Sequence, residues 1–252
     1  MSARRVVVVG ASSGLGRSIG VGLARHGDHV ALLARRRDRL VDAAAEAGGG
    51  AEAIVCDVTE ESSCREAIEA AAEVLGGIDG LVYSTGIMTM APLRQTSADT
   101  WNRTFATNVT GAALVTAAAL PHLVEADGVA VYLSSISASQ TPPWPNIGSY
   151  VASKAALDKL VDAWRAEHPE IGFTRLSVGD CAGGEGSSRT EFVDGVDQEL
   201  FGQSLELWFR RGYMNGGVID VEHLVETVDA VLRCGRSSAL PTVVITPRAP
   251  KS

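Results

Sequence analysis

Tyr150 and Lys154 are the residues whose types and spacing most directly indicate chemistry. They open and close the segment Tyr-Val-Ala-Ser-Lys, ahead of an apolar pattern with helical spacing. Residues four apart lie on one face of a helix, within reach of each other. A cation beside a phenol favours the phenolate, so we expect the pKa of Tyr150 to fall from about 10 toward neutral pH, as proton transfer requires. The alternative is an ordinary amphipathic helix that carries a tyrosine and a lysine.

A glycine-rich segment near the N-terminus supplies a second pattern. It follows the β-branched run Arg5–Val9 and precedes the apolar-periodic stretch Ser18–His26. Glycines allow a tight turn, and a helix N-terminus offers free N–H groups to a pyrophosphate. The spacing is G-x-x-x-G-x-G rather than G-x-G-x-x-G, and a plain helix-entry loop is the alternative. The expected dinucleotide-binding residues are Gly10, Ser12, Ser13, Gly14, Leu15 and Gly16.

The end of the second apolar run bears on which nucleotide is bound. An NAD site usually has an acid there, about 20 residues past the loop, to hold the ribose 2′-hydroxyl. Here Ala34 is followed by Arg35, Arg36 and Arg37. A guanidinium binds a 2′-phosphate in bidentate fashion, so the sequence favours NADP(H) over NAD(H), with Arg35 the first contact and Arg36 the next. A solvated basic helix start is the alternative.

Composition excludes several other classes of protein. The net charge of −8 argues against a nucleic-acid partner or an anionic membrane surface. No run of 18 apolar residues occurs, so we expect no membrane span, and the valine-rich start lacks a signal-peptide cleavage pattern. The scattered cysteines fit reduced thiols in a cytoplasmic protein. The five histidines form no ligand cluster, so no metal site is expected.

Strands and helices alternate along the chain. Short, fully apolar strands between helices predict a parallel sheet covered on both faces, in one domain over residues 1–252. The expected strands are Arg5–Val9, Val30–Ala34, Ala53–Val55, Gly80–Tyr83, Val129–Leu133, Gly172–Val178 and Thr242–Thr246. The expected helices are Ser18–His26, Arg37–Ala47, Ser62–Leu75, Asp99–Leu123, Tyr150–Ala166 and His223–Leu232.

Two segments interrupt this alternation. Gln140–Gly148 contains three prolines, which exclude regular structure. Asp180–Gly217 begins glycine-rich and then becomes aromatic. Long inserts in compact domains often cover a binding site, so we expect this one to cover a substrate, with an extra packed helix as the alternative.

With the glycine loop and the Tyr/Lys pair placed, the chain resembles the short-chain dehydrogenase/reductase family from about Val6 to Val178. The resemblance implies a Rossmann-type, doubly wound, seven-stranded and mainly parallel sheet. It implies that Asp57, with Val58, contacts the adenine, and that Gly86 packs the cofactor. It also implies a catalytic set in which Asn108 supports a proton relay, Ser135 hydrogen-bonds the substrate oxygen, Lys154 binds the nicotinamide ribose and Tyr150 transfers the proton.

Some positions depart from the family pattern. Tyr83-Ser84-Thr85-Gly86 stands where the family has Asn-Asn-Ala-Gly, and only the glycine is kept. The spacing from Ser135 to Tyr150 is two residues longer than usual, which leaves Ser137 as a second candidate. After the sixth strand the usual Pro-Gly and threonine are missing. The carboxamide contacts then fall to the backbone of Asp180–Ala182, or to one of Ser187, Ser188 and Thr190.

The expected function is reversible hydride transfer between NADP(H) and a carbonyl or secondary alcohol, in either physiological direction. A non-catalytic NADPH-binding sensor or scaffold is the alternative. Met88, Met90 and Trp144 predict an apolar substrate pocket. The resemblance implies a homo-dimer or homo-tetramer built on Asp99–Leu123 and Tyr150–Ala166.

Overall fold

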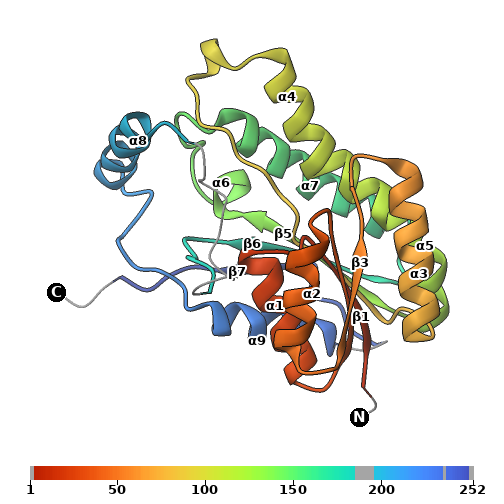
Figure 1. Cartoon of the computed structure of the whole chain (residues 1–252). Coiled ribbons are helices and arrows are strands. Elements are labelled where there is room, and N and C mark those ends of the chain that lie inside the picture. Colours follow the sequence, from red (N-terminus) through yellow and green to blue (C-terminus); the bar gives the residue numbers. More distant parts are fainter. Residues whose placement is uncertain (1–2, 185–195, 235–236, 250–252) are drawn as a thin grey trace.

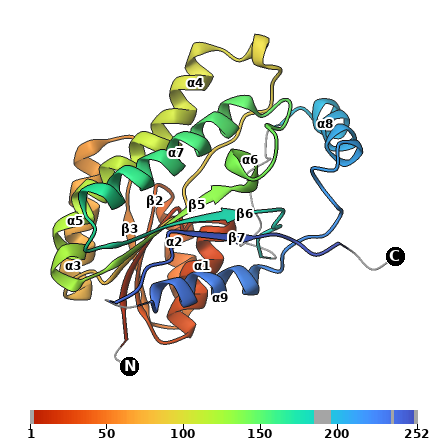
Figure 2. The ribbon, with the colours of Figure 1, turned by 180° about the vertical axis from the view of Figure 1, so that it is seen from behind.

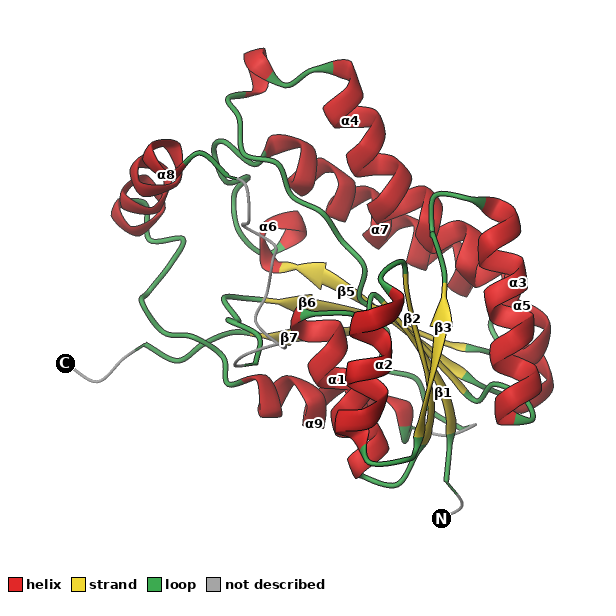
Figure 3. Ribbon diagram, in the orientation of Figure 1, coloured by secondary structure: helices red, strands yellow, loops and turns green. Residues whose placement is uncertain are grey.

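Seven parallel strands form a single sheet in the order β3-β2-β1-β4-β5-β6-β7. The computed structural model describes residues 3–184, 196–234 and 237–249. The doubly wound sheet predicted from the sequence is confirmed, and its pairs are parallel throughout (Figure 3). The strands are β1 (Arg5–Val9), β2 (His29–Ala34), β3 (Ala51–Val55), β4 (Gly80–Tyr83), β5 (Val129–Ser135), β6 (Gly172–Val178) and β7 (Thr242–Ile245).

Helices cover both faces of the sheet (Figures 1 and 2). Alternate valines of β1 explain the two layers, because Val6 and Val8 enter one buried core while Val7 and Val9 enter the other. The first core packs under α1 (Gly14–Arg25), α2 (Arg37–Ala47) and α9 (Val221–Leu232). The second packs under α3 (Glu61–Leu75), α5 (Gly111–Ala126) and α7 (Gly148–Glu167).

The helix predicted over Asp99–Leu123 lies where the sequence predicts it, but it is not one continuous α-helix. It consists of α4 (Ala98–Phe105), a π-helical turn (Ala106–Thr110) and α5. A π turn adds a residue to the helical repeat and is frequent at functional sites. Asn108 lies at the centre of this turn, fully buried.

The same run, Ala98–Ala126, is the one helical stretch in the described parts of the chain that is apolar and long enough to cross a membrane. That criterion is length and composition alone. In this fold α5 packs against α3, and α4 packs against α7, so the run is part of the helical layer. Only 33% of its most apolar window is buried, however, which leaves part of an apolar surface uncovered.

The two irregular segments meet beside the carboxyl ends of β5 and β6. The proline segment follows a short helix, α6 (Ile136–Ser139), and runs to Ile147 without regular structure, as the prolines predict. From the insert, α8 (Gln198–Arg210) lies against it: the Trp208 indole donates to Pro145 O at 3.1 Å, and the Asn146 amide donates to Ser204 Oγ at 2.9 Å. The insert therefore contains a packed helix, which is held by the proline segment.

Candidate active site

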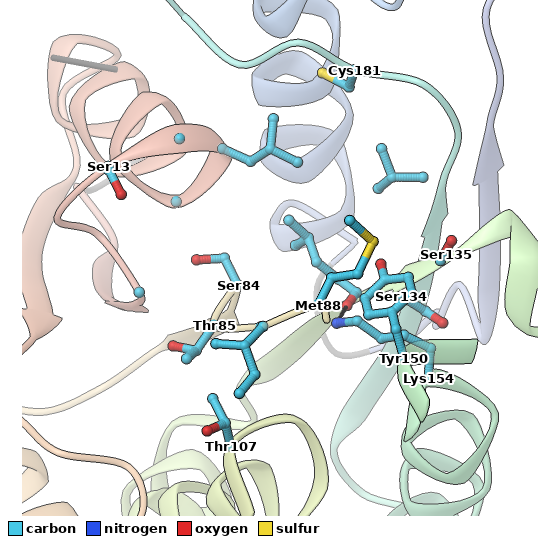
Figure 4. Close-up of a pocket in the computed structure, with 18 of the residues that line it drawn as sticks. Ser13, Ser84, Thr85, Met88, Thr107, Ser134, Ser135, Tyr150, Lys154 and Cys181 are labelled. Atoms are coloured by element: carbon cyan, nitrogen blue, oxygen red, sulfur yellow. Dashed lines mark hydrogen bonds between the residues drawn. The ribbon is translucent and has the colours of Figure 1, made fainter. Parts of the chain in front are cut away.

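A cleft of about 860 Å³ lies at the carboxyl ends of the strands. Its lining extends from the glycine loop to α8. Figure 4 shows Ser13 on one side, Tyr150, Lys154 and Ser135 on the other, and Cys181 above them. The residues predicted as cofactor-binding or catalytic, except Asn108, all line this cleft: Gly10, Ser12, Ser13, Gly14, Leu15, Gly16, Arg35, Arg36, Asp57, Val58, Gly86, Ser135, Tyr150 and Lys154.

The glycine loop is shaped by requirements that only glycine meets. Gly10 has φ +90° and Gly14 has φ +58°, in the left-handed region that side chains disfavour. Gly16 is limited by space instead, because a Cβ there would lie 2.3 Å from Ser84 Oγ and 2.4 Å from Gly10 O. Close contact between the loop and the segment after β4 thus explains why the sequence has glycine at residue 16.

The N-terminus of α1 points its positive dipole end toward the cleft. Its first turn contains no acidic residue that would neutralise that end. The Arg36 guanidinium lies over the loop and donates to Ser12 Oγ at 2.9 Å and to Ser13 Oγ at 2.8 Å. Free N–H groups beside a guanidinium form a site suited to a phosphate.

Asp57 and Arg35 lie together at the far end of the cleft, after β3 and β2. Asp57 Oδ1 accepts from the Thr59 amide at 3.0 Å and from its hydroxyl at 2.8 Å. Burial alone would raise the pKa of Asp57, but the hydrogen bonds from Thr59 and the charge of Arg35 lower it. The carboxylate is therefore held ionised in a fixed orientation, and Arg36, rather than Arg35, is the arginine that contacts the glycine loop.

Asn108 joins three elements of the site although its side chain does not line the cleft. Its Oδ1 accepts from the Ile87 amide at 2.8 Å, and its Nδ2 donates to Ile87 O at 3.0 Å. The same Nδ2 donates to Ser153 Oγ at 2.9 Å, which in turn donates to Tyr150 O at 2.7 Å. The amide thus ties the segment after β4 to the turn of α7 that carries Tyr150.

Ser135 and Tyr150 form the polar centre of the cleft. Ser135 ends β5, and its hydroxyl lies 2.8 Å from Ser137 Oγ and accepts from the Ser137 amide at 3.2 Å. Tyr150 makes a side-chain hydrogen bond with Ser135. The extra residues between them form α6 and the proline segment, which bring Ser135 back to Tyr150 despite the longer spacing. Ser137 supports the Ser135 hydroxyl.

The prediction that the pKa of Tyr150 falls toward neutral pH is wrong. Burial raises it to about 12, and the hydrogen bond with Ser135 offsets only part of that effect. Lys154 Nζ donates to Leu133 O at 2.7 Å and lies 5.9 Å from the centre of the Tyr150 ring. Burial also lowers the pKa of Lys154 to about 8, against an opposing effect of Asp158. Tyr150 and Lys154 share one face of α7, as their spacing predicts, but burial has the largest effect on the pKa of each.

Apolar side chains surround the polar centre. The Trp144 ring lies 5.0 Å from that of Trp208 and 5.9 Å from that of Tyr213, between centroids. From α8, Phe201, Leu205 and Trp208 line one side of the cleft. The apolar lining here comprises Met88, Trp144, Ile147, Phe201, Leu205, Trp208 and Met214.

The segment after β6 approaches the cleft with Val178, Gly179, Asp180 and Cys181. Asp180 O accepts from the Ile219 amide at 2.7 Å, and burial raises the pKa of the Asp180 carboxyl. Of the predicted carboxamide contacts, Asp180 and Cys181 therefore reach the cleft. Ser187, Ser188 and Thr190 lie outside the described residues.

Several lining residues were not predicted as site residues. Most lie directly after a strand or beside a predicted residue, which was the available signal, whereas Arg103 lies within α4 and had no such signal. The set is Cys56, Thr59, Ser84, Thr85, Ile87, Thr89, Arg103, Thr107, Ser134 and Ile136.

Comparison with known proteins identifies this arrangement. A family model described as short chain dehydrogenase matches residues 4–184. The chain belongs to the short-chain dehydrogenase family. Relatives of this chain in the family are named as reductases and dehydrogenases.

Family members that are similar to this chain are named for different substrates. Glycine betaine reductase ATRR of Emericella nidulans is 30% identical over 257 residues, which cover 98% of this chain and 19% of that protein. The 11-beta-hydroxysteroid dehydrogenase A of Sesamum indicum is 34% identical over 180 residues, covering 69% of this chain and 51% of that protein. The chain thus spans a fifth to a half of the length of these relatives.

A solved structure supports the fold over the whole chain. The alcohol dehydrogenase from the archaeon Thermococcus sibiricus, complexed with 5-hydroxy-NADP, aligns with a TM-score of 0.79 at 23% identity. The alignment covers 100% of both chains.

Replacing Gly16 with alanine tests the close packing of the glycine loop. The added Cβ overlaps Gly10 O, which is backbone and cannot move aside, so we expect a loss of about 1–3 kcal/mol in unfolding free energy. Gly202 on α8 is the matched control: a Cβ there meets nothing within 4 Å, so Gly202→Ala should be neutral or stabilising by up to about 1 kcal/mol. Urea unfolding measures both, and a Gly16→Ala variant as stable as the parent contradicts the packing argument.

Proposed function

We propose that this chain is an NADP(H)-dependent oxidoreductase that transfers a hydride between the nicotinamide and a carbonyl or secondary alcohol. The observation that carries the proposal is the arrangement of Tyr150, which is hydrogen-bonded to Ser135, one helical turn from the buried Lys154, and tied through Ser153 to Asn108. These groups meet in a cleft that also contains the glycine loop.

The residues fit a nicotinamide dinucleotide. Gly10 and Gly16 let the loop turn tightly and pack against Ser84 and Thr85, beside the cleft. The α1 N-terminus and Arg36 favour a pyrophosphate or phosphate there. Asp57 and Val58 would hold the adenine end. A Cβ added at Gly86 would lie 3.3 Å from Lys154 Nζ, so the glycine keeps the space beside the lysine free for the ribose. When bound, the cofactor supplies the hydride.

The side chains supply the proton and stabilise charge. Because the pKa of Tyr150 is about 12, its phenol keeps its proton at neutral pH and acts as the acid when a carbonyl is reduced. Ser135 donates a hydrogen bond to the oxygen on which charge develops. Below its pKa of about 8, Lys154 is a cation that stabilises the phenolate left behind. In the oxidative direction the same groups run in reverse, and the ratio of kcat/KM in the two directions identifies the favoured one.

The pocket supports a carbonyl substrate with a bulky apolar body. Its lining beside Tyr150 comes from Trp144, Trp208, Met88 and Met214, and such surfaces bind apolar groups. The relative from Sesamum indicum is named for a hydroxysteroid, a polycyclic alcohol, which has this character. NADPH consumption with alicyclic and aryl ketones, quinones and small aldehydes compares the classes.

A non-catalytic NADPH-binding sensor or scaffold is the competing proposal. Its support is the unusual Tyr83–Gly86 and Gly179–Cys181 segments. Both segments contribute residues to the lining of the cleft, and Ser84 packs against the glycine loop. A sensor has no need of the Ser135–Tyr150 hydrogen bond beside a buried lysine, and we therefore favour the enzyme.

Removing the Tyr150 hydroxyl separates these two proposals. Tyr150→Phe keeps the ring but loses the proton donor, so kcat should fall about 100-fold or more. NADPH affinity, measured by fluorescence titration, should stay within about threefold. A variant that retains most of its turnover would refute Tyr150 as the acid.

The arginines after β2 test the nucleotide preference. A lost charge-assisted contact to a phosphate costs about 1.5–3 kcal/mol, so Arg36→Ala should weaken NADPH binding about tenfold or more and leave NADH binding nearly unchanged. Arg35→Ala, measured in parallel, shows which arginine carries the larger share. Arg37, also exposed but outside the cleft lining, is the control. Equal losses for NADPH and NADH would refute a 2′-phosphate contact.

We also propose a homo-dimer or homo-tetramer with α4 and α5 in the interface. The support is the partly uncovered apolar run Ala98–Ala126, on which Val124 is 43% exposed. Burying such a surface between copies is favourable.

A charge on that surface tests the assembly. Val124→Glu should shift sedimentation toward the monomer, because it buries a charge in an apolar interface. Val41→Glu on α2, where the valine is 50% exposed, is the control and should leave the assembly unchanged. A wild-type chain that sediments as a monomer would refute the proposal.

Finally, we infer a reducing, cytoplasmic setting. The four cysteines are all free thiols, including Cys56 and Cys64, which lie within hydrogen-bonding distance of each other. An oxidising compartment would favour their oxidation to a disulfide.

A further inference from the structure

A buried carboxylate lies one helical turn beyond Lys154. Asp158 is 3% exposed, on the same face of α7 as Tyr150 and Lys154. Its Oδ2 accepts from Ser139 Oγ at 3.3 Å, while Oδ1 is buried without a hydrogen-bond partner among the described residues. Buried carboxylates are costly unless paired, so this one requires an explanation that the proposed mechanism has not given.

Two buried hydroxyls lie on the sheet face that α7 covers. Ser134 of β5 and Ser177 of β6 are register partners, and neither Oγ has a hydrogen-bond partner in the described structure. The neighbouring residues Leu133 and Leu176 point into the core under α1, α2 and α9. Because successive side chains of a strand point to opposite faces of the sheet, both serine hydroxyls face α7.

The register along α7 brings Asp158 toward these hydroxyls. Asp162 Oδ2 lies 3.4 Å from Arg175 Nη1 on β6. One helical turn back from Asp162 is Asp158, and two residues forward from Arg175 is Ser177. A helical turn rises about 5.4 Å and two strand residues about 6.6 Å, so the two steps nearly match.

We propose that Asp158 is a positioning residue that keeps Lys154 charged. The carboxylate lies in a buried polar pocket that it forms with Ser134, Ser139 and Ser177, and ordered water completes this pocket. Polar atoms of buried side chains nearly always have a partner, and a buried water typically bridges about three of them. The inference rests on the proposed function, in which the Lys154 cation supports Tyr150.

The electrostatic effect has a definite sign. Burial lowers the pKa of Lys154 to about 8, and the charge of Asp158 acts in the opposite direction. Loss of the carboxylate therefore lowers this pKa further, and the lysine loses its proton at a lower pH. If Tyr150 depends on a charged Lys154, the alkaline limb of the activity profile must move to lower pH by the same amount.

The other ionisable groups around this part of α7 leave Asp158 as the main anion. On α7, Tyr150 lies before Lys154, and Asp162 pairs with Arg175 of β6, Lys159 and Arg165. On β5, Tyr132 shares the face, and burial keeps its pKa raised. On α4, Asp99 and Arg103 are exposed. No charged residue occurs on α6.

The chain offers a direct measurement, because it contains only three lysines: Lys154, Lys159 and Lys251. With 13C at lysine Cε, NMR resolves three titrating signals, which Lys159→Arg and Lys251→Arg assign. In Asp158→Asn, which preserves shape, the Lys154 midpoint should fall by about one pH unit. Asp158→Glu should restore it to within a few tenths of a unit.

Asp162→Asn is the matched control, since it removes a carboxylate one turn further along and should leave the Lys154 midpoint in place. The double variant Ser134→Ala, Ser177→Ala should move the midpoint in the same direction as Asp158→Asn, and it tests the pocket if Asp158→Asn does not fold. An unchanged midpoint in Asp158→Asn, or an equal shift in Asp162→Asn, overturns the proposal.

Activity gives the second readout and separates this inference from the proposed function. The alkaline limb of kcat/KM in Asp158→Asn should follow the NMR midpoint downward, while KM for NADPH changes less than kcat. A shifted NMR midpoint with a fully active Tyr150→Phe enzyme would support the Asp158–Lys154 coupling and refute the proposed role of Tyr150. A shifted activity limb with an unshifted Lys154 midpoint would overturn the coupling.

Discussion

The parallel order of the strands is the constraint on which the rest of this structure depends. Because all seven strands run the same way, their carboxyl ends, and the segments that follow them, meet at one edge. The order reverses between β1 and β4, and a crevice opens at such a switch point. The glycine loop after β1, the Ser84–Gly86 segment after β4 and Ser135 at the end of β5 meet there (Figure 4). Residues separated by more than 100 positions in sequence thus share one cleft.

Within that edge, the Asn108 side chain fixes the distance between two independent elements. The amide oxygen accepts a hydrogen bond from the Ile87 N–H, and the amide nitrogen donates to Ile87 O and to Ser153 Oγ. The π turn provides the extra residue that aims this side chain inward, which explains why an irregular turn persists in an otherwise good helix. An aspartate at this position would lack both donors. Asn108 therefore acts on Tyr150 through the frame of the site, by way of Ser153 and the α7 backbone.

Sequence reasoning recovered the features that depend on local pattern. Apolar runs gave the seven strands, the glycine spacing gave the loop, and the Tyr150 and Lys154 spacing gave their shared helix face. It missed what depends on packing between distant segments. The pKa of Tyr150 was predicted to fall, but the degree of burial is set by α6 and α8, whose positions no local pattern fixes. Nor does a local pattern say which guanidinium lies over Ser12 and Ser13, because that depends on how β2 leads into α2; the guanidinium is that of Arg36.

Burial explains why Tyr150 and Lys154 require more than each other. Removing both groups from water stabilises the neutral phenol and the neutral amine, so burial alone acts against the phenolate–ammonium pair. Their spacing on α7 does not overcome that cost. Hydrogen bonds must do so: Ser135 on the phenol, and Leu133 O on the ammonium. A carboxylate at residue 158 adds a charge of the required sign without exposing the site to solvent. The Tyr150–Lys154 pair is thus half of an electrostatic unit whose other half lies on β5 and further along α7.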